Sequence, residues 1–201
     1  MGVNMKKVKI DCITLLWIAF IIYAKGSLVI HLFLAILLHE LGHISACLFL
    51  KVKIKSLRLS LLGAKMELEG SFSYLKEFII ALAGPSFGIM GYLVASSLGR
   101  NSQDLMLFAL ISLCLSVFNL FPIQSLDGGR IAKCLFCSIL PLTSSEKIMQ
   151  IISFFTLFAF WIFSSYIMIK FAGGLSAFVF CAIFFSKCFV FGTKKRDFES
   201  F

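Results

Sequence analysis

Runs of about 20 apolar residues recur along this 201-residue chain, and they restrict what it can fold into. A helix of that length crosses the hydrocarbon layer of a membrane, whereas soluble domains carry more charge along their helices. Hydrophobic residues make up 60% of the chain and charged residues only 14%. The sequence therefore predicts a protein that is embedded in a lipid bilayer.

Six segments are apolar enough to be membrane spans, so we expect an all-α polytopic bundle that forms a single membrane-embedded domain over residues 1–201. Only three residues, 25–27, separate the first two spans, which predicts a tight helical hairpin. The expected spans are residues 10–24, 28–50, 77–99, 105–121, 148–169 and 174–192.

The basic residues predict an orientation for these spans. Cytoplasmic loops are enriched in Lys and Arg. If the N-terminus is cytoplasmic, all of the 19 Lys and Arg residues face the cytoplasm except Lys25, Arg100 and Lys170. We therefore expect a multi-pass protein with both termini in the cytoplasm. Because the basic residues lie in short clusters between apolar runs, the net charge of +9 does not indicate a nucleic-acid partner.

Residues 51–70 differ from the spans because polar and apolar residues alternate there. Alternation with a period of two predicts a small β-hairpin at the cytoplasmic membrane surface. The alternation slips at Ser56-Leu57, which indicates a β-bulge. Two interpretations of the segment stay open: an amphipathic surface loop, or a sheet edge that pairs with an extended peptide.

The second span contains His39-Glu40-Leu41-Gly42-His43, which is an HExxH pattern. On a helix, residues four apart differ by about 40° of rotation, so both imidazoles face the same side and can bind one zinc ion. Glu40 can then serve as the general base that activates water. The alternative, polar residues packed between helices, is weaker because a charged side chain in a membrane span is costly.

A catalytic zinc needs a third protein ligand, and Asp127 is the strongest candidate. His31 lies two turns before His39 on the same helix and is too far away to share the metal. Asp127 lies between Pro122, which stops a helix, and Gly128-Gly129, which permits a sharp turn. Such irregular backbone within a membrane lines a wet cavity or is buried in protein. The competing interpretation is a cytoplasmic turn in which Asp127 caps the next helix.

These motifs together resemble the site-2 protease family of intramembrane zinc metalloproteases, which is peptidase family M50. The resemblance covers about residues 28–135, the expected catalytic core, and leaves residues 10–24, 148–169 and 174–192 as accessory helices. A weaker likeness to the family's Ala-Gly-Pro motif lies at 83–85. The matching motifs are Leu-His-Glu-Leu-Gly-His at 38–43, Phe-Asn-Leu-Phe-Pro at 118–122 and Leu-Asp-Gly-Gly-Arg at 126–130.

The resemblance implies a role for each matching residue. His39, His43 and Asp127 would bind one zinc ion per chain, and Glu40 would be the catalytic base. Asn119 would be a second catalytic residue that holds the substrate or stabilises the developing oxyanion. On residue type alone, Asn119 could instead be a helix-packing residue.

The chain departs from the family at two places. Gln124-Ser125 stand where the family often has prolines, and Gly88 stands where it has Asn. The compact plan is most similar to the sporulation branch of the family, which processes a sigma-factor precursor, although the nucleotide-sensing tail of that branch is not found here. The resemblance thus implies a bacterial membrane protein.

The expected partners are a membrane-associated protein substrate, membrane lipids and an inhibitory membrane protein, without nucleic acid. The expected reaction is hydrolysis of a peptide bond in a membrane-spanning or membrane-associated protein. Two other functions stay open: a zinc-binding transporter and a non-catalytic scaffold. A transporter needs a polar pathway through several spans, and polar residues are sparse in the last two. A zinc protease with a downstream Glu ligand is the nearest enzymatic alternative.

Overall fold

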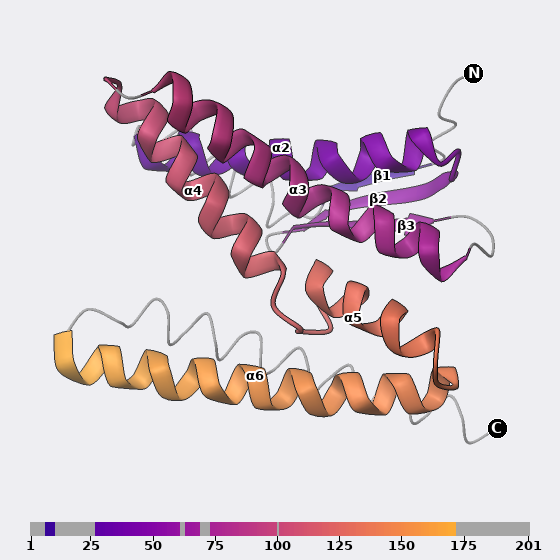
Figure 1. Cartoon of the computed structure of the whole chain (residues 1–201). Helices are drawn as coiled ribbons and strands as arrows, with labels where there is room; N and C mark the ends of the chain where they lie inside the picture. Colours follow the sequence, from indigo (N-terminus) through magenta and orange to yellow (C-terminus); the bar gives the residue numbers. More distant parts are fainter. Residues whose placement is uncertain (1–6, 11–26, 61–62, 69–72, 100, 172–201) are drawn as a thin grey trace. The chain divides into compact units, whose positions relative to one another are not determined.

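The computed structural model describes eight helices and strands within five stretches of the chain (Figure 1). They belong to two compact units, one ending at Asn119 and the other beginning at Leu120, and each unit is described by itself. The described residues are 7–10, 27–60, 63–68, 73–99 and 101–171.

Three apolar helices dominate the first unit: α2 (Ser27–Phe49), α3 (Tyr74–Leu98) and α4 (Gln103–Asn119). Helices α2 and α3 are long and apolar enough to cross a membrane, whereas α4 is shorter, with 17 residues. Although the apolar run continues to Phe121, α4 ends at Asn119. Pro122 accounts for this, because a proline disfavours helical backbone at the residue before it.

The described strands form one small sheet in the order β1 (Lys7–Ile10), β2 (Ile54–Ser60) and β3 (Gly63–Leu68). β2 and β3 pair antiparallel within the segment for which the sequence predicts a hairpin. Their register shifts between Ile54 and Ser56, beside the expected bulge. β1 pairs parallel with β2 and was not predicted, because its partner lies far along the chain.

The end of α2 is fixed by a Schellman motif at Lys51, which adopts a left-handed backbone conformation with φ of 54°. The Val52 N–H donates to the Cys47 carbonyl at 2.9 Å, and the Lys51 N–H donates to the Leu48 carbonyl at 3.2 Å. Two of the last carbonyls of the helix are thereby satisfied. The motif turns the chain from α2 directly into β2.

Gly88 is a point of close approach between α3 and α4. A Cβ atom at this position would overlap the Ser116 hydroxyl of α4. That hydroxyl is buried and donates to the Ser112 carbonyl at 2.8 Å. A side chain at residue 88 would require the Ser116 hydroxyl to move, so glycine suits this close approach of α3 to α4.

The second unit holds α5 (Asp127–Cys137) and α6 (Leu142–Phe171). Lys133 on α5 donates to the Glu146 carboxylate on α6 at 2.9 Å, which joins the two helices by an ion pair. The part of α6 up to Tyr166 is long and apolar enough to cross a membrane. It begins at Leu142, earlier than the expected span.

The structure confirms that the chain contains long apolar helices, as the sequence predicts. Within the described residues, three helices have the length and composition of membrane spans, and α4 is a shorter apolar helix. The expected spans at 10–24 and 174–192 lie outside the described residues. The count of six spans and the single domain therefore stay predictions.

Candidate metal centre

The two histidines of the HExxH pattern face each other on α2. His39 and His43 are both buried, with exposed fractions of 5% and 6%. Their rings meet edge to face with centroids 4.9 Å apart, and the two Nε2 atoms are 3.2 Å apart. Two ligands at ~2.05 Å from a tetrahedral zinc ion are ~3.3 Å apart, so this spacing suits a shared metal.

The protonation of His43 is set by a backbone carbonyl of α3. His43 Nδ1 lies 2.8 Å from the Ile80 carbonyl oxygen. Since a carbonyl oxygen can only accept, Nδ1 carries the proton and donates, and Nε2 keeps its lone pair for a metal. A backbone carbonyl in this role orients the ring without adding charge to the site.

Two glycines allow α3 to pack directly on these histidines. A Cβ atom at Gly84 would overlap His43 Nε2 and would lie 2.9 Å from His39 Nε2. A Cβ atom at Gly42 would lie 2.5 Å from the Ala83 carbonyl oxygen. Gly42 belongs to the HExxH pattern and Gly84 to the Ala-Gly-Pro motif, so the two motifs meet in one helix contact.

We expect Gly84→Ala to lower the zinc affinity of the purified chain by at least about 10-fold, the lower range for changes next to metal ligands. The added methyl group must displace both imidazoles. Competition with a zinc chelator measures the affinity. The matched control is Gly91→Ala on the same helix, where the methyl group overlaps only the flexible end of the Leu38 side chain and touches Phe108 at an ordinary contact distance. Equal zinc affinities of the two variants would contradict the role assigned to Gly84.

Asp127, in the second unit, is the first residue of α5 and has an exposed fraction of 9%. Leu126 is the N-cap residue of α5. Asp127 therefore does not cap this helix, as it would in the competing interpretation of a cytoplasmic turn. Its carboxylate lies 3.9 Å from the Arg130 guanidinium. The next two residues, Gly128 and Gly129, have no room for side chains because the preceding loop packs on them.

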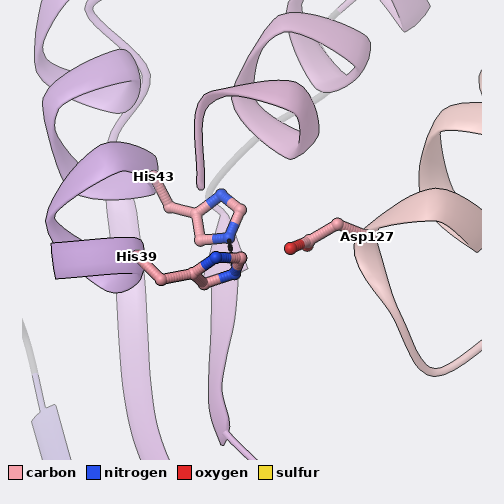
Figure 2. A group of neighbouring side chains, drawn as sticks. All are labelled: His39, His43 and Asp127. Atoms are coloured by element: carbon pink, nitrogen blue, oxygen red, sulfur yellow. Dashed lines mark hydrogen bonds between the residues drawn. The ribbon is translucent and has the colours of Figure 1, made fainter. Parts of the chain in front are cut away.

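Figure 2 shows the side chains of His39, His43 and Asp127 as one group of neighbours. One candidate ligand atom from each residue lies within 4.8 Å of the others, and all three residues are buried. Two imidazole nitrogens and one carboxylate oxygen are a donor set that zinc accepts in catalytic sites. The three residues that the sequence predicts as ligands therefore fit a zinc ion.

The other predicted residues take different places. Glu40 is half-buried on α2, next to His39 in sequence. Asn119 is half-buried at the end of α4, and its side-chain amide donates to the Leu115 carbonyl at 3.0 Å. His31 contacts the Ser27 carbonyl of its own helix at 2.5 Å and does not join the group. Its exclusion as a ligand is thus in agreement with the structure.

Peptidase family M50 is the family whose model matches this chain, over residues 96–163. Over this segment the chain is similar to peptidase family M50. The matched residues include Asn119 and Asp127, whereas the HExxH pattern lies before them. The resemblance predicted from the motifs is confirmed, and similarity to this metalloprotease family implies a metal, typically zinc.

Individual proteins similar to this chain agree with that result. The "Stage IV sporulation protein FB" of Bacillus subtilis (strain 168) is 33% identical over 152 residues, which are 70% of this chain and 52% of that protein. A Synechocystis protein whose name describes a zinc metalloprotease is 32% identical over 117 residues, 54% of this chain and 31% of that one. The chain thus spans about half or less of the curated relatives it matches.

A solved structure shares the fold. The "Site-2 Protease from Methanocaldococcus jannaschii" superposes with a TM-score of 0.70, at 22% identity, over 90% of this chain and 88% of that one. At this identity, the match concerns the fold alone. It extends well beyond residues 28–135, over which the motifs predict the resemblance.

Proposed function

We propose that this chain is a zinc metalloendopeptidase that hydrolyses a peptide bond of a membrane-spanning or membrane-associated protein. The observation that carries the proposal is the convergence of His39, His43 and Asp127 in a chain with a segment similar to peptidase family M50. The names of two relatives, a zinc metalloprotease and a sporulation protein, support it further.

The metal would be held by the Nε2 atoms of His39 and His43 and by the Asp127 carboxylate. When bound, zinc supplies Lewis-acid chemistry that polarises a carbonyl group and makes water a stronger acid. Glu40 takes a proton from the attacking water while the water oxygen bonds to the scissile carbonyl carbon. Glu40 then returns this proton to the amine nitrogen as the carbon–nitrogen bond breaks.

Asn119 is proposed to bind the carbonyl oxygen of the substrate. Its amide nitrogen carries two hydrogens, and one suffices for the bond to the Leu115 carbonyl. That bond fixes the rotamer of the amide on its own helix. The second hydrogen is then suited to donate to the oxygen that gains negative charge during hydrolysis.

The substrate must present an extended backbone, because the peptide groups of a helix are shielded by their own hydrogen bonds. In the described sheet β2 is the central strand, so a substrate strand would pair with an edge strand such as β3. A sigma-factor precursor is a candidate substrate because of the sporulation relative, and an inhibitory membrane protein is a candidate partner. The positions of the basic residues support cytoplasmic termini.

The proposal is tested by reconstituting the full chain in lipid vesicles together with candidate single-span substrates. Cleavage that requires added zinc and stops with a chelator is the expected result. Zinc uptake into the vesicles is measured in parallel. Zinc uptake without cleavage of any candidate would favour a transporter, and the absence of both would favour a scaffold.

A further inference from the structure

We propose that Ser153 on α6 is a positioning residue for Asp127, acting through the loop that precedes α5. This inference rests on the proposed metalloprotease function and assigns a role to a helix outside the predicted catalytic core. The contacts that carry it all lie within the second unit.

Ser153 is buried, with an exposed fraction of 1%, and its hydroxyl bonds outside its own helix. The Ser153 Oγ accepts the Gln124 N–H at 2.9 Å and donates to the Pro122 carbonyl at 3.4 Å. Other hydroxyls on α6 behave differently. Those of Thr156 and Ser165 donate to the carbonyl four residues earlier in α6, as is usual for helical Ser and Thr.

The loop bonded by Ser153 packs on the backbone beside Asp127. A Cβ atom at Gly128 would lie 2.5 Å from the Phe121 carbonyl oxygen, and one at Gly129 would lie 2.8 Å from the Gln124 Cα atom. The loop therefore lies in van der Waals contact with the first turn of α5. A movement of the loop must displace Asp127, because no side chain lies between the loop and this turn to absorb it.

Two further contacts hold the loop compact. The Ile123 N–H donates to the Phe121 carbonyl at 2.7 Å, and the Leu126 N–H donates to the Ile123 carbonyl at 2.8 Å. The Phe121 ring also meets the Phe160 ring of α6 edge to face, with centroids 4.8 Å apart. Ser153 and Phe160 therefore both attach the loop to α6.

The departure of this chain from the site-2 protease family at Gln124-Ser125 fits the same role. A proline restricts the backbone by itself but has no N–H to donate. Gln124 lacks that restriction, and its N–H is the group that Ser153 accepts. A hydrogen bond from α6 thus takes the place of the ring of a proline in holding the loop.

The test measures the zinc affinity of the full chain in detergent by chelator competition, with no need for a substrate. Ser153→Ala should lower the affinity by about 10-fold, the lower end of the range for partners bonded directly to a metal ligand, because Ser153 acts on Asp127 only through the loop. Ser153→Thr keeps the hydroxyl and Ser153→Val removes it at the same volume, so the Ser153→Thr chain should bind zinc more tightly than the Ser153→Val chain. When the chains are loaded with Co²⁺, the visible absorption spectrum of Ser153→Ala should differ from that of the wild type.

Two buried serines of α6 serve as matched controls. Ser145 bonds the Pro141 carbonyl at 3.1 Å, away from the loop, and Ser164 is buried without a hydrogen bond in the described residues. Their Ala variants should keep the affinity of the wild type. A loss with Ser145→Ala as large as that with Ser153→Ala would overturn the proposal, because it would indicate general loosening of α6.

A double-mutant cycle separates this proposal from the proposed function. If Ser153 acts through Asp127, Ser153→Ala should cause no further loss of affinity in an Asp127→Asn background. Ser153→Ala with the affinity of the wild type would overturn the positioning role alone. Zinc binding that is insensitive to Asp127→Asn would overturn both the metal site and the role of Ser153.

Discussion

Glu40→Gln is expected to lower the rate of cleavage in the vesicle assay by about 10²–10⁴-fold, the usual contribution of a general base. Glutamine has nearly the shape of glutamate but cannot take a proton from water at neutral pH. Glu40 does not belong to the group of candidate ligands, so the variant should still bind one zinc ion per chain. Zinc content by atomic absorption and cleavage by gel analysis measure the two effects separately.

The matched control is Glu77→Gln, which removes a half-buried carboxylate from α3. This variant should cleave the substrate as the wild type does. Two results would contradict the assignment of Glu40. Undiminished cleavage by Glu40→Gln would exclude it as the base, and loss of zinc together with cleavage would indicate that it holds the metal.

Asp127→Asn is expected to lower zinc affinity by at least about 100-fold, the upper range found for residues that only support a ligand. The amide preserves the size of the side chain but removes the negative charge that a zinc ligand supplies. The change also removes the charge beside Arg130, which is 3.9 Å away. Chelator competition gives the affinity, and far-ultraviolet circular dichroism checks that the helices persist.

Asp104→Asn is the control, because Asp104 is an exposed carboxylate in the first turn of α4. It should leave zinc affinity and cleavage unchanged. Full zinc affinity in Asp127→Asn would show that another residue is the third ligand. A zinc protease with a downstream Glu ligand would then be the better description of the chain.

The features that the sequence predicts well are those set by local periodicity. The four-residue spacing of His39 and His43 predicts neighbouring rings on one helix face, and their Nε2 atoms are 3.2 Å apart. The alternation over residues 51–70 likewise predicts β2 and β3. The ends of α2 and α3 fall within a few residues of the expected spans, because apolar runs define them.

The features that the sequence does not predict depend on contacts between distant segments. Ile80 orients His43 through a backbone carbonyl, which no side-chain pattern reveals. Gly84 is visible as part of a motif, but its proximity to the imidazoles follows from helix packing. Ser153 stands in an apolar run with no motif around it, and only its hydrogen bond to Gln124 distinguishes it. β1 was missed for the same reason, since parallel pairing joins segments far apart in the chain.

X-ray absorption at the zinc edge of the purified wild-type chain tests the metal site most directly. Two imidazole nitrogens and at least one oxygen at ~2.0–2.2 Å are the predicted ligands, with no sulfur. In Asp127→Asn, loaded with excess zinc, the imidazole scattering should remain while the oxygen shell changes. A sulfur shell at ~2.3 Å, or the absence of imidazole scattering in the wild type, would contradict a metal held by His39, His43 and Asp127.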